Sequence, residues 1–311
     1  MTESFPSKIL LFGEYSIIRG GSGLAIPYST YSGALQIGSL ISELDEGINT
    51  ELVEGFNPEP VEGKSLLPLF HHLQKNSDLF PFIHLEKFKH ELQMGLWFNS
   101  NIPEGYGLGS SGALVAALYD RFHISEPNDL FTLKNHLAAL ESFFHGSSSG
   151  IDPMVAYLKK AIMLRSNSPV TLNNWNINSL GLSVFLVDTG VKSKTLQLVD
   201  WFKAKMEQER FRQATAEDYF RFNEQIIHQV EKNESIDLAN VLAISRYQLE
   251  YLNPMIPESF RKHFFDGLNS RDFAFKLCGS GGGGYMLCFA NDAAEMKNYF
   301  SIHQLKYEQV V

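Results

Sequence analysis

Residues 103–118, PEGYGLGSSGALVAAL, constrain the fold more than any other part of the chain. Three glycines and two serines occupy positions 107–112, directly before a series of small apolar residues. This pattern predicts a loop that opens into a helix, whose first N–H groups and dipole favour an anion. Gly107 and Gly109 have no side chain that would keep an anion away from the backbone. A glycine-rich turn with serine N-caps is the alternative.

Two common nucleotide-binding motifs fit this loop poorly. Positions 107–112 satisfy G-x-G-x-x-G, but the dinucleotide fingerprint also needs an acidic residue that ends a strand about 20 residues later. The sequence from Pro127 onward predicts the start of a helix instead. The one Gly-Lys-Ser triplet, residues 63–65, has Pro58 where a Walker A loop requires its first glycine. We therefore disfavour both a Rossmann domain and a Walker A loop.

Composition limits the class of protein. The 311 residues, 44% of them hydrophobic, are enough for two domains. A net charge of −9 disfavours nucleic acid as a partner. The sequence has neither an N-terminal signal peptide pattern nor an apolar run of 18 residues, which predicts a cytoplasmic protein that does not enter a membrane. Cys278 and Cys288 lie in apolar, strand-like sequence and are expected to be buried thiols.

The order of predicted elements indicates an α+β protein with a domain boundary near residues 155–160, which gives domains 1–157 and 158–311. Strands are expected at 8–18, 24–36, 95–99, 161–165, 182–188, 273–277 and 285–289. Helices are expected at 85–92, after the glycine loop, at 127–144 with Gly146 as the stop, and three or four times between 194 and 265. A helix and a strand are expected after residue 289, whereas residues 42–64 are polar and predict a loop.

Two carboxylates follow the loop in the sequence. Glu141 falls on the apolar stripe of the helix predicted at 127–144, where a carboxylate must either be paired with a cation or bind a metal. A buried Lys or Arg partner and a divalent cation beside the phosphate loop both remain open. Asp152 comes eleven residues later in HGSSSGIDP, where it is either a turn or cap residue or a catalytic group.

A second glycine-rich run occurs near the end of the chain, in KLCGSGGGGYMLCF at 276–289. Five glycines among six residues would destabilise an ordinary hairpin, so we expect the backbone here to approach a ligand closely. Two other motifs carry no function. Asp188-Thr-Gly has no second copy to complete an aspartic protease pair, and His71-His72 lacks the spacing of a zinc site.

Three of these stretches together resemble the GHMP kinases. PEGYGLGSSGA is similar to the family's phosphate-binding motif, KLCGSGGGGYMLCF to its C-terminal glycine motif, and SKILLFGEYSIIRGGSGLAIP to its N-terminal segment. The segment from Glu141 to Asp152 and the segment from Asp188 to Thr195 are most similar to those of mevalonate kinases. The resemblance implies an N-terminal domain like ribosomal protein S5 domain 2 and a C-terminal ferredoxin-like domain.

The resemblance also implies roles for individual residues. It makes Asp152 the catalytic base and places Lys8 beside it, where the lysine lowers the pKa of the attacking hydroxyl. It assigns the phosphates of ATP to Gly107, Leu108, Gly109, Ser110, Ser111 and Gly112. It assigns Mg²⁺ to Ser111 and Glu141, and the neighbourhood of the acceptor alcohol to Glu14, Ser149 and Thr195.

The sequence departs from the mevalonate kinase pattern at three positions, with Tyr15 for histidine, Ser148 for proline and Cys278 for threonine. These changes weaken the prediction of the acceptor more than the prediction of the reaction. We expect an ATP-dependent small-molecule kinase with mevalonate as the favoured acceptor.

A phosphomevalonate or sugar (heptose) kinase stays open, because Arg19, Lys192 and Lys194 could bind a phosphorylated acceptor. A catalytically silent sensor protein of the same fold is the alternative from another class. Loss of Lys8, Ser111, Glu141 or Asp152 would have favoured it, and all four are present. A homodimer also stays open.

Overall fold

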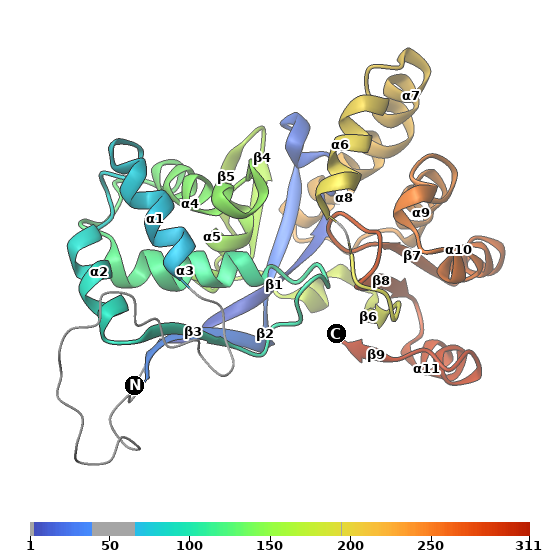
Figure 1. The fold of residues 1–311 in the computed structure, drawn as a ribbon. Coiled ribbons are helices and arrows are strands. Elements are labelled where there is room, and N and C mark those ends of the chain that lie inside the picture. The colour runs from blue at the N-terminus through green and yellow to red at the C-terminus, as the bar shows by residue number, and fades with distance from the viewer. Residues whose placement is uncertain (1–2, 39–65, 194) are drawn as a thin grey trace. The chain divides into compact units, whose positions relative to one another are not determined.

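The computed structural model describes residues 3–38, 66–193 and 195–311, so the loop predicted at 42–64 and Lys194 lie outside the described residues (Figure 1). The helices are α1 Leu67–Lys75, α2 Leu85–Gln93, α3 Ser110–Phe122, α4 Leu130–His145, α5 Ile151–Leu158, α6 Thr195–Lys205, α7 Glu209–Ala214, α8 Arg221–Glu231, α9 Leu238–Tyr251, α10 Glu258–Ser270 and α11 Ala293–Ile302. The strands are β1 Phe5–Phe12, β2 Gly23–Ile37, β3 Leu96–Ser100, β4 Ile162–Arg165, β5 Ser168–Thr171, β6 Ser183–Asp188, β7 Phe273–Leu277, β8 Tyr285–Ala290 and β9 Tyr307–Gln309. A π-helix, Thr215–Phe220, connects α7 to α8. The α+β expectation is confirmed.

Contacts divide the chain into two compact units. The first contains the described residues of 1–7, 28–102 and 109–159, and the second contains those of 8–27, 103–108 and 160–311. The main change from one unit to the other, at 159–160, is near the predicted boundary at 157–158. Two earlier segments, 8–27 and 103–108, group with the second unit. The domain limits 1–157 and 158–311 stay a prediction.

The first unit is built around α3, which packs against α4 and α5 (Figure 1). The helix from Gly112 to Tyr119 is completely buried, as its small apolar residues predict. In α4 the carboxylate of Asp129 accepts a hydrogen bond of 2.8 Å from the N–H of Thr132. Asp129 is therefore the N-cap, so the helix begins at Leu130 rather than at the predicted Pro127. Gly146, at φ +71°, ends it as predicted.

The second unit contains an antiparallel sheet with strand order β7-β8-β6-β9, against which α9 and α10 pack through β7. Every residue of β7 and β8 is buried, so both faces of these strands are covered. Cys278 and Cys288 are both buried, as expected. Burial raises the pKa of the Cys288 thiol well above its usual range, which makes it a poor nucleophile.

One predicted strand is too long. The segment 8–18 leaves the extended conformation after Phe12, because Gly13 and Tyr15 have positive φ angles of 109° and 62°. Residues Ile17–Arg19 then form a 3₁₀ helix. The strands predicted at 24–36, 161–165, 182–188 and 273–277 are confirmed to within a residue or two, as is the helix predicted at 85–92. Among the described helices, none combines the length and the apolar character that crossing a membrane requires.

Candidate active site

The N-terminus of α3 is the first part of the site. Gly109, at φ +71°, occupies the N-cap position, so the helix begins at Ser110. The first N–H groups of a helix have no acceptor within it and point outward along its axis. A β-carbon on Gly112 would lie 2.9 Å from Cβ of Asp152 and 2.8 Å from its carbonyl carbon. Glycine at position 112 therefore lets the first turns of α3 and α5 touch, and it places Asp152 beside the predicted phosphate loop.

Glu141 is buried, with only 4% of the residue exposed, as the apolar stripe of α4 predicts. Its Oε1 atom accepts a hydrogen bond of 3.3 Å from the Ser111 hydroxyl. Its Oε2 atom accepts a second hydrogen bond from the hydroxyl of Ser148. Nε2 of His145 lies 2.9 Å from the same Ser111 hydroxyl. The structure thus brings together Ser111 and Glu141, the two predicted Mg²⁺ ligands.

Their chemistry fits this ion, because Mg²⁺ prefers carboxylate and hydroxyl oxygens. Sequence reasoning does not assign a role to His145 or Ser148. From the sequence Ser148 is only a departure from a family proline, and the structure shows what its hydroxyl does.

The serine-rich segment after α4 turns the chain tightly into α5. Gly150 adopts φ +75°, and a β-carbon there would lie 2.5 Å from the carbonyl oxygen of Lys134. The Ser148 hydroxyl accepts a hydrogen bond of 2.9 Å from the N–H of Gly150. The Ser149 hydroxyl accepts a longer one, 3.4 Å, from the N–H of Ile151. This turn places Asp152 in the first turn of α5.

The second unit holds the start of the first glycine loop. The N–H of Lys8 donates a hydrogen bond of 2.9 Å to the carbonyl of Leu108. Gly107 adopts φ +81°, and a β-carbon there would lie 2.6 Å from the carbonyl oxygen of Cys278. Gly107 and Leu108 therefore pack against β1 on one side and against the start of the second glycine loop on the other. Lys8 itself is buried.

Glu14 forms a buried ion pair in the same unit. Nζ of Lys276 donates a hydrogen bond of 2.5 Å to Oε1 of Glu14, and both side chains are almost completely buried. Oε2 of Glu14 has no hydrogen-bond partner among the described residues. Burial raises the pKa of Glu14, while the charges of Lys276 and Lys8 oppose that rise. Sequence reasoning missed Lys276, although a single lysine inside the apolar strand FAFKL was a usable signal.

The second glycine loop is held mainly by its own unit. The hydroxyl of Tyr15 donates a hydrogen bond of 2.6 Å to the carbonyl of Ser280. The N–H groups of Gly282 and Gly284 donate to the carbonyls of Met255 and Val191 at 2.6 and 2.5 Å. β-Carbons on Gly281, Gly282, Gly283 and Gly284 would each lie under 3.0 Å from protein atoms. The close approach predicted for a ligand is therefore an approach to the protein's own chain.

Two further predicted segments can be located. Oδ1 of Asp188, which ends β6, accepts a hydrogen bond of 2.7 Å from the N–H of Gly190, and the hydroxyl of Thr189 donates to the carbonyl of Gly284. The Asp-Thr-Gly triplet thus forms a turn and supports the second glycine loop. Thr195 is the first residue of α6, but its side chain lies outside the described part. Its acceptor role stays a prediction.

Comparisons with known proteins show what this chain is similar to. Residues 80–160 match the family model "GHMP kinases N terminal domain", a range that includes α3, α4 and α5. The mevalonate kinase of Pyrococcus abyssi is 24% identical, over 92% of this chain and 88% of that protein.

Two solved structures illustrate the shared fold. The mevalonate kinase of Methanococcus jannaschii is 17% identical, with a TM-score of 0.60 over 99% of this chain and 97% of that one. The phosphomevalonate kinase of Streptococcus pneumoniae, in complex with phosphomevalonate and AMPPNP, is 14% identical, with a TM-score of 0.63 over the full length of both chains. The expected two-domain GHMP kinase fold is confirmed.

Proposed function

We propose that this protein, which has the GHMP kinase fold, transfers the γ-phosphate of ATP to the hydroxyl group of a small alcohol, with mevalonate as the favoured acceptor. The observation that carries the proposal is the buried carboxylate of Glu141 beside Ser111 in the first turn of α3. A buried carboxylate and a hydroxyl at a helix N-terminus form a suitable site for a phosphate with its bound cation. The phosphomevalonate kinase with AMPPNP, an ATP analogue, supports the choice of nucleotide.

In this mechanism the first turn of α3 and the preceding glycines bind and orient the phosphates. Ser111 and Glu141 would hold Mg²⁺, which supplies neutralisation of charge on the phosphates. The acceptor hydroxyl forms a bond to the γ-phosphorus as the bond from that phosphorus to the β–γ bridging oxygen breaks. Asp152 takes the hydroxyl proton, and Lys8 stabilises the developing negative charge on the attacking oxygen. ADP leaves with the bridging oxygen.

The acceptor is inferred from two features. The spacing from Glu141 to Asp152 follows the mevalonate kinase pattern, and a mevalonate kinase is among the relatives. Glu14, Ser149 and Thr195 would contact the acceptor. A phosphorylated acceptor is the main rival, and it would need cations such as Arg19 and Lys192, both of which are exposed. Phosphomevalonate kinase has the same fold, so the fold does not decide between these acceptors.

The test is release of ADP from Mg-ATP in the presence of mevalonate, phosphomevalonate, homoserine, galactose or heptose 7-phosphate. We expect turnover with mevalonate. Turnover confined to a sugar or a phosphorylated acceptor would refute mevalonate but keep the reaction. Absence of turnover with every acceptor, with ATP still bound in calorimetry, would instead support the silent sensor.

Asp152→Asn tests the base in the same assay. The rate should fall about a hundredfold or more, because a positioned general base contributes that much. Binding of Mg-ATP should persist. Asp78→Asn, a change at an exposed aspartate of the same unit, is the matched control and should leave the rate unchanged. Full turnover by Asp152→Asn would remove Asp152 from this role.

A further inference from the structure

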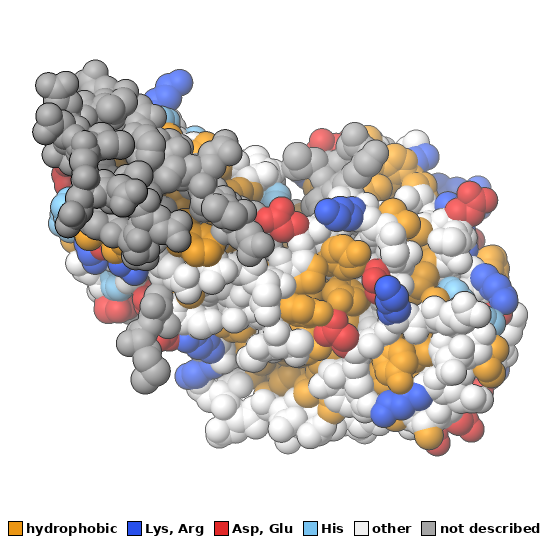
Figure 2. Space-filling model, turned by 60° about the horizontal axis from the view of Figure 1, so that its bottom comes forward, with side chains coloured by type: hydrophobic (Ala, Val, Ile, Leu, Met, Phe, Trp, Pro, Cys, Tyr) orange, Lys and Arg blue, Asp and Glu red, His pale blue; other side chains and the backbone are white. Residues whose placement is uncertain are grey.

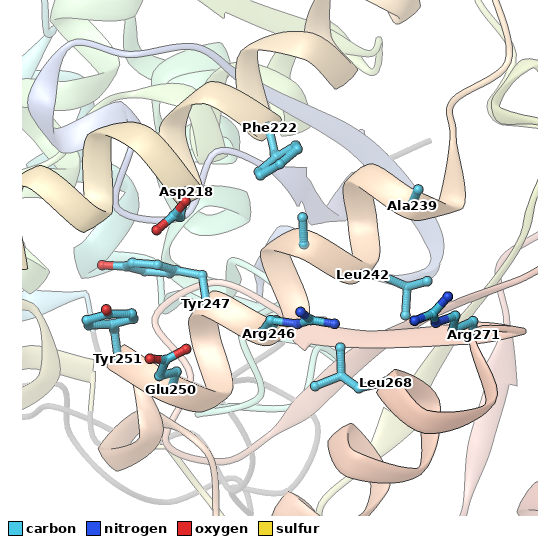
Figure 3. Close-up of a pocket in the computed structure, with 11 residues that line it drawn as sticks. Asp218, Phe222, Ala239, Leu242, Arg246, Tyr247, Glu250, Tyr251, Leu268 and Arg271 are labelled. Atoms are coloured by element: carbon cyan, nitrogen blue, oxygen red, sulfur yellow. The ribbon is translucent and has the colours of Figure 1, made fainter.

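A pocket of about 460 Å³ lies in the second unit, among the π-helix, α8, α9 and α10 (Figure 3). Its volume is within the range of small-molecule sites. None of its lining residues belongs to the candidate active site. One wall is the π-helix, a rare conformation that occurs frequently at functional sites.

Two arginines line this pocket, with Arg271 at one end and Arg246 nearer its middle in Figure 3. Arg246 on α9 and Arg271 at the C-cap of α10 point toward one another in Figure 3. Arg246 has Glu250 four residues later on the same helix, a spacing that allows an ion pair. In the described part of the chain, however, neither arginine forms a salt bridge. Two facing guanidinium groups repel each other, and an anion between them would remove that repulsion.

The rest of the pocket has a different character. Leu242 and Leu268 lie on either side of the arginine pair, and the ring of Phe222 lies farther along the wall (Figure 3). The opposite end carries the carboxylates of Asp218 and Glu250 beside two tyrosines. The pocket therefore combines two cationic groups and apolar side chains on one side with an acidic end on the other.

We propose that this pocket binds a small organic anion with one charged group, a phosphate monoester or a carboxylate, attached to an apolar body. The charged group lies between Arg246 and Arg271, which offer paired N–H donors. The apolar body covers the leucines and Phe222. The carboxylates of Asp218 and Glu250 disfavour a second anionic group at the far end of the ligand.

Contacts connect the pocket with the candidate active site inside the same unit. Tyr247, which lines the pocket, stacks on Tyr219 of the π-helix with ring centroids 5.0 Å apart and planes 2° apart. The hydroxyl of Tyr219 donates a hydrogen bond of 2.7 Å to the carbonyl of Glu14. Gln248, next to Tyr247 on α9, accepts a hydrogen bond of 2.8 Å from the N–H of Leu277. A ligand whose apolar body extends past Phe222 to Tyr247 would therefore act on the packing that holds the Glu14 turn, and this step rests on the proposed kinase function.

Titration calorimetry with hexyl phosphate and heptanoate tests the site directly, without any assay of activity. The comparison of these two probes identifies the preferred charged group. Hexanol, which lacks the charge, and inorganic phosphate, which lacks the body, should bind at least about tenfold more weakly, since each loses one set of contacts. Hexane-1,6-bisphosphate should also bind more weakly than hexyl phosphate, although it carries more charge.

Arg246→Gln and Arg271→Gln should each reduce the affinity for the tighter probe about tenfold. Arg210→Gln, at an exposed arginine of α7 outside the pocket, is the matched control and should not change it. Any of three results would overturn the site. Hexanol could bind as tightly as hexyl phosphate, both pocket variants could bind the probe with wild-type affinity, or neither charged probe could bind. All three arginines are exposed, so the variants should fold, and melting curves check this.

A second measurement tests the connection. Saturating probe should change the rate of ADP release in the wild type, and the change should require higher probe concentrations in Arg246→Gln. An unchanged rate at saturation, with binding intact, would overturn the connection alone. Failure of the kinase proposal would appear separately, as absence of turnover without any probe.

Discussion

The two glycine-rich loops look alike in sequence but do different work in the structure. The first loop leads into α3 and presents the first turn of that helix, with Glu141 bonded to Ser111 behind it. The second loop connects β7 to β8, and N–H groups of its glycines donate to carbonyls of the same unit. Glycine content therefore indicates an unusual backbone conformation in both. The element that follows each loop differs, because the first loop leads into a helix N-terminus, whose N–H groups favour an anion, and the second leads into a strand.

The molecule carries charged residues both on its surface and in its interior, where one ion pair precedes the second loop. On the face of the molecule in Figure 2, Lys and Arg side chains are interspersed with Asp and Glu among the described residues, as is usual for a solvated surface. Lys276, which leads into the second loop, is instead completely buried with Glu14. Tyr15 adds a hydrogen bond to the same loop. The second loop is thus preceded by a buried ion pair, whereas the first loop has a buried carboxylate, Glu141, bonded to the Ser111 hydroxyl.

The largest expected effect tests this dependence. Lys276→Met should lower the free energy of unfolding by about 3–5 kcal/mol at pH 7, because Glu14 would remain buried without its partner. The measurement is urea denaturation followed by circular dichroism. The double variant Glu14→Gln/Lys276→Met should recover most of the loss, since no charge is then left buried. A loss under about 1 kcal/mol in the single variant would contradict the buried ion pair between Glu14 and Lys276.

The same variant has a defined pH dependence. Burial raises the folded-state pKa of Glu14 above its ordinary value of 4.5, and removal of Lys276, which lowers that pKa, should raise it further. A carboxyl with a raised pKa binds its proton more tightly in the folded state, so its effect on stability becomes less favourable as pH rises from 4.5 to the folded pKa. The deficit of Lys276→Met should therefore shrink from about pH 7 to about pH 5. A constant deficit would mean that Glu14 does not titrate in that window.

A smaller effect should follow from the packing of the second loop. Gly284 adopts φ +68°, and a β-carbon there would lie 2.5 Å from Cα of Tyr106. Gly284→Ala should cost about 2–4 kcal/mol, from a strained backbone and a clash with main-chain atoms. Gly190 has nearly the same angle, φ +70°, but a β-carbon there would meet no atom within 4 Å, so Gly190→Ala should cost about 1 kcal/mol. Equal losses, measured by the same urea denaturation, would show that backbone conformation alone explains the glycines.

Sequence reasoning predicted the local features well and the long-range ones poorly. The helix after the first loop and the burial of Glu141 follow from periodicity within one segment. The partner of Glu14, Lys276, is separated from it by 262 residues, and no local pattern specifies such a pair. The end of β1 was missed because a positive φ at Tyr15 is uncommon for a residue with a side chain. The glycines of the second loop correctly indicated close approach, but their neighbours are protein atoms.

The smallest expected effect comes from Ser148, beside the first loop. It tests whether this residue positions Glu141 or only stabilises the fold. Ser148 holds the Oε2 side of Glu141 and accepts the N–H of Gly150, so Ser148→Ala should cost about 1 kcal/mol of stability. Because its loss removes one hydrogen bond that positions Glu141, the Mg²⁺ concentration for half-maximal kinase rate should rise about threefold. Glu141→Gln, which removes the charge, should raise it further. Ser142→Ala is the matched control, since among the described residues that hydroxyl donates to the carbonyl of Ala139 on the same helix, away from Glu141. Its Mg²⁺ requirement should equal that of the wild type. If Ser148→Ala loses stability but keeps its Mg²⁺ requirement, Ser148 only shapes the turn before Asp152. In that case the predicted Mg²⁺ site beside the first loop would depend on Ser111 and Glu141 and not on the Ser148 hydroxyl.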